Sequence, residues 1–278
     1  MTKVLLAGCG KMGSAMLAGW LSKLNDPLSF TIVDPMISPD HPAASHPAAS
    51  HPGASDSRVT ILTALDDSIE APDIIVLAMK PQMMPDALPG LAKIASADTV
   101  WLSIAAGVTM AKLKQQLGQS AAIIRTMPNT PAAIGLGVTA MIMDDQVPAD
   151  VAQLAVRMME VIGDVVMLDH EDDMDSVTGV SGSGPAYVFL MREALEEAAI
   201  AAGLTPELAA KLAAATLTGA VGLMNESDET PSQLRVNVTS PAGTTQAALD
   251  VLMADDGLPA LMRRAVLAAR DRSRELGK

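Results

Sequence analysis

The feature that most constrains the fold is a glycine-rich turn near the start of the chain. Residues 3–7 form an apolar run typical of a buried strand, and residues 14–23 have a helical pattern. The glycines between them have the spacing G-x-G-x-x-G. Gly8 permits a tight turn, Gly10 lets a ligand approach the backbone, and Gly13 lets the helix pack closely on the strand. The turn therefore predicts a dinucleotide pyrophosphate site formed by Gly8, Cys9, Gly10, Lys11, Met12 and Gly13.

Strand-like and helix-like segments alternate as far as residue 168, which predicts a doubly wound α/β sheet. The expected strands cover residues 3–7, 29–33, 59–62, 74–78, 99–103, 122–127, 138–143 and 165–168. The expected helices cover residues 14–23, 84–94, 109–117 and 151–161. Ligands of such sheets bind where the strands end, so three loops there are candidates for coenzyme contact, although each could be only a connection. Their candidate residues are Ala78, Met79, Lys80, Pro81, Ala105, Ala106, Gly107 and Asn129.

Asp34 directly follows the second expected strand. A carboxylate at this place accepts hydrogen bonds from the adenosine ribose hydroxyls and repels a 2′-phosphate. The loop after it has no arginine before Arg58. The sequence therefore favours NADH over NADPH. The alternative is that Asp34 only begins a turn before Pro35.

That loop also contains a short repeat, residues 41–55, in which His41, His46 and His51 are each followed by proline. Regularly spaced histidines are compatible with a metal site. The prolines and the low-complexity composition favour an extended insertion instead. We expect no metal site.

After residue 168 the strand pattern ends, and the chain reads as helices interrupted at residues 181–185, 203, 225–231 and 240–243. The acidic run at 170–173 is expected to be a solvated boundary or a helix start. We therefore expect a dinucleotide-binding Rossmann domain at 1–169 and an all-helical domain at 170–278. Helices this apolar, in so small a domain, predict packing against another subunit.

A second candidate site is the turn that runs from Ser240 to Gly243, directly before Thr244, Thr245 and an apolar helical run. Free backbone N–H groups and the helix dipole would hold a small carboxylate there without Arg or Lys. An ordinary helix cap is the alternative. The predicted hydride-carrying coenzyme needs a small substrate, which favours the anion site.

Composition narrows the partners and the location. A net charge of −13 argues against nucleic acid and anionic membrane surfaces. The single cysteine, Cys9, has no partner in the chain, is expected to lie in packing, and fits a reducing cytoplasm. The first apolar run is too short for a signal peptide, and no later segment is expected to have the uninterrupted apolar length of a membrane span.

The chain resembles the pyrroline-5-carboxylate reductases over nearly its whole length. The resemblance is carried in order by GCGKMG, AMKPQ, IAAGV, RTMPNTP, TGVSGSGPAY and LRVNVTSPAGTT, of which the last two are the most specific. It implies NAD(P)H-dependent reduction of 1-pyrroline-5-carboxylate to L-proline, the last step of proline synthesis. It also implies an interlocked dimer of helical domains, with assembly into decamers, and Thr245 as the catalytic residue near the ring nitrogen. The substrate contacts that it implies are Glu171, Asn237, Ser240, Gly243, Thr244 and Thr245.

Three departures from the family pattern matter. Ala242 replaces a glycine of the turn, which is tolerable only if its φ is negative. Asp34 stands where the family commonly has a small or neutral residue. An asparagine that some members place near the adenosine ribose is absent around Leu65.

Two other functions remain alternatives. A 3-hydroxyacid dehydrogenase joins similar domains but needs a lysine, with an asparagine one helical turn later, as a base, and residues 185–193 contain no such pair. An iminium is already electrophilic, so its reduction depends on orientation and needs no strong general acid. The second alternative is a dinucleotide sensor without catalytic activity.

Overall fold

The computed structural model describes residues 1–37, 56–66 and 68–277, so the His-Pro repeat lies outside the described residues. The chain forms two compact units. The first contains Met1–Gly182 together with Ala269–Lys278, and the second contains Ser183–Ala268. The first unit thus extends past the boundary expected after residue 169 and also includes the end of the chain. Hydrogen bonds from residues 171 and 273 into this unit, described below, account for the difference.

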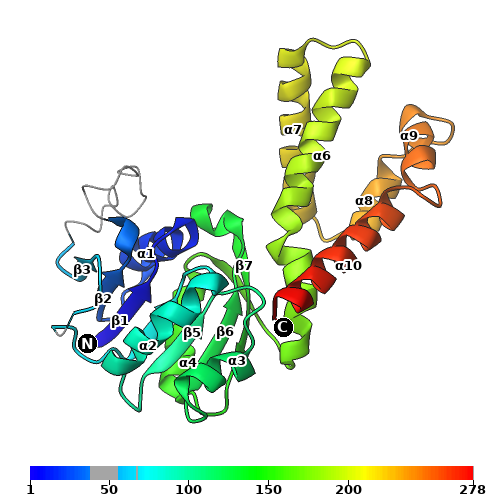
Figure 1. The fold of residues 1–278 in the computed structure, drawn as a ribbon. Coiled ribbons are helices and arrows are strands. Elements are labelled where there is room, and N and C mark those ends of the chain that lie inside the picture. The colour runs from blue at the N-terminus through cyan, green and yellow to red at the C-terminus, as the bar shows by residue number, and fades with distance from the viewer. Residues whose placement is uncertain (38–55, 67, 278) are drawn as a thin grey trace. The chain divides into compact units, whose positions relative to one another are not determined.

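The first unit is built on one sheet of eight strands in the order β3-β2-β1-β4-β5-β6-β7-β8 (Figure 1). The strands are β1 (Thr2–Ala7), β2 (Leu28–Val33), β3 (Val59–Leu62), β4 (Ile74–Leu77), β5 (Val100–Ser103), β6 (Ala122–Met127), β7 (Gly137–Met143) and β8 (Gly163–Met167). Neighbouring strands are parallel except β6 and β7. The strand order reverses between β1 and β4, where Ala7 pairs with Leu77. This is the switch point at which such sheets bind ligands.

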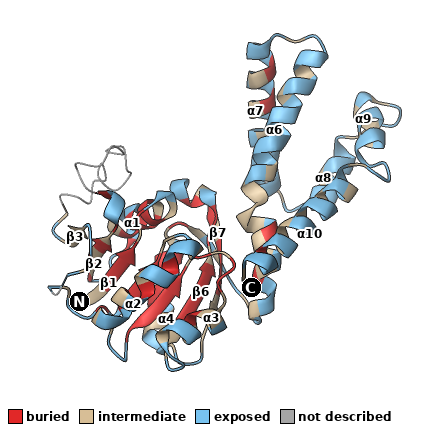
Figure 2. Cartoon of the chain, viewed as in Figure 1, coloured by how far each residue is buried: buried red, intermediate tan, exposed pale blue. Residues whose placement is uncertain are grey.

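Helices cover both faces of the sheet and enclose two cores. On one face α1 (Lys11–Lys23) and α4 (Ala149–Glu160) pack over Val4 and Leu6 of β1. On the other face α2 (Met84–Ile94) and α3 (Met110–Leu117) pack over Leu5 and Ala7. Figure 2 shows the buried strands between these exposed helix faces. Because both faces are covered, the strands are continuous apolar runs rather than alternating ones.

The predicted doubly wound sheet is confirmed, with all eight strands and the four helices of this unit within three residues of their expected bounds. The largest difference is at α1, which begins at Lys11 and so includes half of the glycine motif. The antiparallel pairing of β7 was not predicted. Strand direction depends on the path of the connecting chain, here a short 3-10 turn at Thr130–Ile134, and not on the apolar pattern of the strand.

A short stretch of helical turns, η5 (Glu171–Asp173), α5 (Met174–Val177) and η6 (Thr178–Gly182), leads out of the sheet. The second unit then consists of helices, as expected. They are α6 (Gly184–Ala201), α7 (Pro206–Glu226), α8 (Pro231–Asn237), α9 (Thr244–Leu252) and the first part of α10 (Leu258–Gly277). Thr205 and Thr230 cap α7 and α8, each accepting a hydrogen bond from a backbone N–H of the first turn.

The second unit leaves much apolar surface uncovered. Of the residues from 183 to 268, only Ala209 and Ala213 are buried. Helix α7 has the length and, with a mean hydropathy of 1.2, the composition that a membrane span requires. The expectation that no later segment has the uninterrupted apolar length of a membrane span is not contradicted by α7, because Glu207 and Lys211 interrupt its apolar run.

Candidate functional site

The glycine turn joins β1 to α1 at the switch point. Gly8 has a φ of +90°, and a Cβ on it would lie 2.8 Å from the carbonyl oxygen of Ala78. A Cβ on Gly13 would lie 2.7 Å from the carbonyl oxygen of Gly8. Gly10 is the N-cap of α1, and a Cβ there would meet no described atom within 4 Å. The first and third glycines are therefore required by close packing, and the second leaves the helix start open, as a pyrophosphate site needs.

The carboxylate of Asp34 supports this turn from the end of β2. Its Oδ2 accepts a hydrogen bond of 2.6 Å from the backbone N–H of Cys9, and its Oδ1 accepts one of 2.8 Å from Met36. The residue is only 7% exposed. The hydrogen bond from Met36 forms the turn before Pro35 that was the alternative interpretation of Asp34. The hydrogen bond from Cys9 also joins the carboxylate to the glycine motif. Contact with a ribose stays a prediction.

Cys9 is buried, as expected. Its Sγ lies 3.5 Å from the hydroxyl oxygen of Ser14. Burial raises the pKa of the Cys9 thiol from 9.0 to about 11, despite the hydrogen bond with Ser14, which lowers it. Since the thiolate is the reactive form, this side chain is inert at neutral pH.

The two loops expected to contact a nicotinamide follow β4 and β5. Ala78 donates its N–H to the carbonyl of Ala7, which holds the loop 78–81 against the end of β1. Gly107 has a φ of +74°, and a Cβ on it would lie 3.1 Å from the Cβ of Leu276. The last turn of α10 therefore packs on the loop 105–107. The sequence offered no signal for this contact.

The side chain of Asn129 is committed to backbone partners. Its Nδ2 donates to the carbonyl of Ser181 at 3.1 Å, and its Oδ1 accepts from the N–H of Val138 at 2.9 Å. The side-chain amide joins the start of β7 to the π-turn of η6. Its expected contact with the coenzyme remains a prediction. For such a contact the amide still has its second N–H and the second lone pair of Oδ1.

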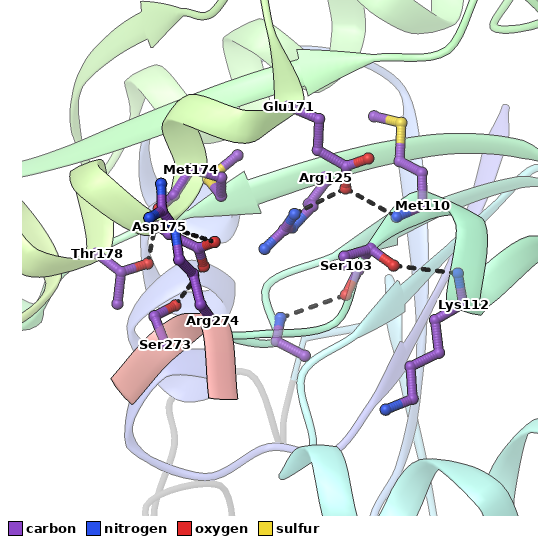
Figure 3. Close-up of polar contacts among 12 residues, drawn as sticks. Ser103, Met110, Lys112, Arg125, Glu171, Met174, Asp175, Thr178, Ser273 and Arg274 are labelled. Carbon is purple, nitrogen blue, oxygen red and sulfur yellow. Dashed lines mark hydrogen bonds and ion pairs between the residues drawn. The ribbon is translucent and has the colours of Figure 1, made fainter. Parts of the chain in front are cut away.

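Glu171 is the residue of the acidic run that is not simply solvated. Its Oε1 accepts hydrogen bonds from the guanidinium of Arg125 at 2.7 Å and from the backbone N–H of Met110 at 2.8 Å. Figure 3 shows these three residues, from separate segments, pointing toward one another. The expectation of a solvated boundary or a helix start is met by η5, which begins at Glu171, whereas the two hydrogen bonds of Glu171 were not expected.

The end of the chain is fixed beside this cluster in Figure 3. The hydroxyl of Ser273 donates to Oδ1 of Asp175 at 2.6 Å, and Ser273 is 3% exposed. Arg274 lies 3.7 Å from the other carboxylate oxygen of Asp175. These contacts explain why residues from Ala269 onward belong to the first unit. Asp175 and Ser273 were both missed by the sequence reasoning.

The turn before α9 lies in the second unit. Gly243 is the N-cap of α9 and offers no side chain as a cap. The backbone N–H groups of Thr244 and Thr245 make no hydrogen bond with any described residue. The interpretation of the threonines as ordinary helix caps is therefore wrong, because they lie inside the helix and supply free N–H groups to its start.

The expectation of a negative φ at Ala242 is also wrong. Its φ is +57°, and it is the only described residue other than glycine with a positive φ. The N–H of Gly243 donates to the carbonyl of Ser240 at 3.0 Å, which closes a turn with Pro241 and Ala242 at its centre. A proline followed by a positive φ is the type II arrangement. Gly243 is required for a different reason, because a Cβ there would lie 3.0 Å from the Ser240 carbonyl oxygen.

Asn237 ends α8, close to this turn in sequence. Its Nδ2 donates to both carboxylate oxygens of Glu229 at 3.0 Å, and its Oδ1 accepts from Gln233 at 2.8 Å. A hollow of about 450 Å³ lies between α8 and α9, on the two helices that the turn connects. It is lined by Arg235, Val236, Thr239, Gln246, Leu249, Asp250 and Met253.

Comparison with known proteins assigns both parts of the chain. Residues 171–276 match the family described as pyrroline-5-carboxylate reductase dimerisation, and residues 3–107 match NADP oxidoreductase coenzyme F420-dependent. A pyrroline-5-carboxylate reductase from Corynebacterium melassecola is 34% identical over 100% of both chains. Another from Synechocystis sp. is 44% identical over 74% of this chain and 76% of its own. The chain belongs to the pyrroline-5-carboxylate reductase family.

Solved structures of the family agree in fold. A pyrroline-5-carboxylate reductase from Coxiella burnetii superposes with a TM-score of 0.84 and 31% identity, covering 100% of this chain and 99% of that one. The Plasmodium falciparum enzyme, solved with NADP bound, has a TM-score of 0.80 and 26% identity, covering 100% and 98%. Within this reductase family, the chain's coenzyme-binding fold and its helical dimerisation domain are therefore established.

Metal sites receive no support in the part of the chain that the structure describes, since no group of three or more His, Cys, Asp or Glu residues there could hold an ion. The repeat with three of the four histidines lies outside that part. The fourth, His170, precedes the anchored Glu171.

Proposed function

We propose that this protein reduces 1-pyrroline-5-carboxylate to L-proline with a hydride from NADPH or NADH. The proposal is carried by the match to pyrroline-5-carboxylate reductase over 100% of both chains, which includes the glycine turn and the turn before α9. The geometry of each part fits the task. An open helix start lies within the glycine motif of the first unit, and free N–H groups begin α9 in the second.

The coenzyme would be held by the ends of the parallel strands. The backbone of Gly8, Cys9, Gly10, Lys11, Met12 and Gly13 would receive the pyrophosphate at the positive end of the α1 dipole. The loops 78–81 and 105–107, with Asn129, would support the nicotinamide and its ribose. When bound, the reduced nicotinamide supplies the hydride, while the protein sets its orientation and keeps water away.

We propose a preference for NADH. The support is Asp34, a carboxylate fixed at the end of β2 by two backbone hydrogen bonds and therefore unable to turn away from a 2′-phosphate. Arg58 offers no free compensating charge, because its guanidinium donates to Asp56 at 2.8 Å and to the carbonyl of Leu21 at 3.0 Å. The opposing consideration is the NADP named in the matched family and in the relative from Plasmodium falciparum.

The substrate is a small zwitterion, with a carboxylate and, when protonated, a cationic ring nitrogen. We propose that the N–H groups of Thr244 and Thr245 and the turn from Ser240 to Gly243 bind its carboxylate at the start of α9. Thr245 would place its hydroxyl at the ring nitrogen, and Glu171 and Asn237 would complete the contacts. Since the iminium is already electrophilic, the contribution of these residues is to hold the reacting carbon in line with the hydride.

Membership of the dimerisation family means self-association, and we propose an interlocked dimer that assembles further into decamers. The support is the uncovered apolar surface of the second unit, including Phe189 at 61% and Leu190 at 63% exposure. An apolar hollow of about 720 Å³ between α6, α7 and α10 offers room for a partner's side chains. Covering this surface would also account for the apolar face of α7. A cytoplasmic location completes the proposal, supported by a single, unpaired cysteine.

The test is loss of the reduced-nicotinamide absorbance when purified protein meets pyrroline-5-carboxylate, in parallel with NADH and NADPH. Turnover establishes the reaction, and the ratio of the two kcat/KM values decides the coenzyme. Coenzyme binding without turnover would remove the reductase assignment. In that case, oxidation of a 3-hydroxyacid would favour the dehydrogenase alternative, and inactivity on both would favour the sensor.

A further inference from the structure

Arg125 is a buried cation whose position is not explained by the sheet alone. It lies within β6, its side chain is 3% exposed, and Glu171 is its only charged partner among the described residues. Its Nε is buried and makes no hydrogen bond in the part of the chain that the structure describes. A desolvated guanidinium with an unmet donor is unfavourable, and an apolar side chain would serve a strand interior better. Arg125 therefore points to a role beyond packing.

Only one of the two carboxylate oxygens of Glu171 accepts hydrogen bonds from described residues. Oε1 of Glu171 accepts from Arg125 and from the N–H of Met110, at 2.7 and 2.8 Å. Oε2 accepts no hydrogen bond from any residue that the structure describes. The side chain is 28% exposed, so this second oxygen belongs to a group that solvent or a ligand reaches. One oxygen is fixed, and the other is available.

The anchor is placed at the coenzyme edge of the sheet. Met110 is the first residue of α3, which directly follows the coenzyme loop 105–107. Strand β6, which carries Arg125, ends at Met127, close to Asn129. Both groups that hold Glu171 therefore lie near the carboxyl ends of β5 and β6, the edge of the sheet to which the predicted nicotinamide contacts belong.

We infer that Arg125 is a positioning residue for the reduction and acts through Glu171. Together with the Met110 N–H it fixes Oε1, so that the negative charge at Oε2 faces the protonated ring nitrogen of the cyclic imine. The inference rests on the proposed function, since it needs a cationic cyclic imine as substrate. Arg125 itself touches neither substrate nor coenzyme. A fixed carboxylate costs no reorientation when the cation binds.

The charge of the substrate determines which constant should change. Hydride addition neutralises the iminium, so its attraction to Glu171 is stronger in the bound ground state than in the transition state. Loss of the anchor should therefore raise KM for the imine and leave kcat unchanged or somewhat higher. The dissociation constant of the reduced coenzyme should stay the same, because no part of the anchor is assigned to it.

A proline at residue 110 isolates the anchor from packing. Met110→Pro deletes only the N–H donor, at the first helical position, where proline is tolerated. The preceding Thr109 has φ −79° and ψ 158°, which suits a residue before proline. Met110→Ala is the matched control, because it shortens the same side chain but keeps the N–H. We expect Met110→Pro to raise the imine KM about 10-fold above Met110→Ala.

The guanidinium is tested with Arg125→Lys and Arg125→Met. Arg125→Lys keeps the positive charge and should therefore raise the imine KM less than Arg125→Met does. Arg125→Met and Glu171→Gln should each raise the imine KM by about 10-fold or more. The double variant Arg125→Met/Glu171→Gln should be no worse than either single one, because both remove the same contact. Arg157→Met, which breaks an exposed ion pair of 2.8 Å with Asp26, is the control and should leave KM unchanged.

Coenzyme binding by fluorescence and thermal unfolding are measured on every variant. An unchanged imine KM in Met110→Pro and Arg125→Lys, or additive effects in the double variant, would overturn the positioning role. So would a parallel loss of coenzyme affinity, which indicates general damage. These outcomes are distinct from failure of the proposed function, which is inactivity of the unsubstituted protein toward the imine and which would remove the inference as well.

Discussion

Ala242→Gly should stabilise the protein, although glycine is the more flexible residue. Ala242 adopts a φ of +57° at the second central position of the turn that is closed by Gly243 N–H and the Ser240 carbonyl. A side chain in this left-handed region costs about 1–2 kcal/mol. The extra unfolded-state entropy of glycine offsets about 0.4–1 kcal/mol of that. The expected net gain is about 0.5–1 kcal/mol.

The matched control is Ala248→Gly in α9. Ala248 is exposed and lies inside the helix, where glycine costs about 1 kcal/mol relative to alanine. The same chemical change should therefore raise the unfolding free energy at residue 242 and lower it at residue 248. The separation between the two variants is about 1.5–2 kcal/mol.

Urea unfolding, followed by far-ultraviolet circular dichroism, measures this difference. Both tryptophans, Trp20 and Trp101, lie in the first unit, so the helical signal is the better probe of the turn. All variants are compared at one protein concentration, because self-association shifts the apparent stability. Equal destabilisation by Ala242→Gly and Ala248→Gly would show that the left-handed turn is not formed, and would refute the reasoning.

Four further outcomes are expected. Asp34→Ser should shift the ratio of kcat/KM toward NADPH by about 10-fold, measured with both coenzymes; an unchanged ratio would remove Asp34 as the discriminating residue. Thr245→Ala should lower turnover more than it weakens coenzyme binding, and equal losses in the two would count against its catalytic role. Leu190→Glu should prevent dimer formation in sedimentation experiments, because it places a charge on the apolar surface of α6, whereas an intact dimer would place the interface elsewhere. Burial raises the pKa of the Cys9 thiol to about 11 in the folded protein, so its contribution to stability should be complete below pH 9 and fall as the pH rises toward 11, by up to about 1.4 kcal/mol per pH unit. Cys9→Ala should flatten this loss of unfolding free energy with pH. An equally steep loss in Cys9→Ala would show that other groups cause it.

The first unit could be predicted well because its signals are local. Apolar runs of strand length, the glycine spacing and the loops at strand ends each lie within a few residues, and the sheet, its order reversal and the buried Cys9 followed. The direction of β7 did not follow, because the apolar pattern of a strand is the same in both directions. The same locality explains the helical caps of the second unit, where Thr205 and Thr230 precede proline.

The functional details depended on contacts between distant segments. Glu171 looked like part of a solvated acidic run, and only the structure pairs it with Arg125, 46 residues earlier. The last turn of α10 could not be assigned to the first unit before Ser273 was seen bonded to Asp175, 98 residues away. Ala242 takes a positive φ because the closed turn requires it, despite its own preference.

By itself, the sequence determined the two fold classes, the family and the candidate loops, because spacing and periodicity set local backbone structure. Only the tertiary structure decided which carboxylate oxygens are already hydrogen-bonded. Asp34 and Glu171 are equally acidic as sequence letters, yet each is committed through hydrogen bonds to a backbone N–H from another segment, of Cys9 and of Met110. The availability of a polar atom depends on the neighbours that folding brings to it, and these neighbours lie far apart along the chain.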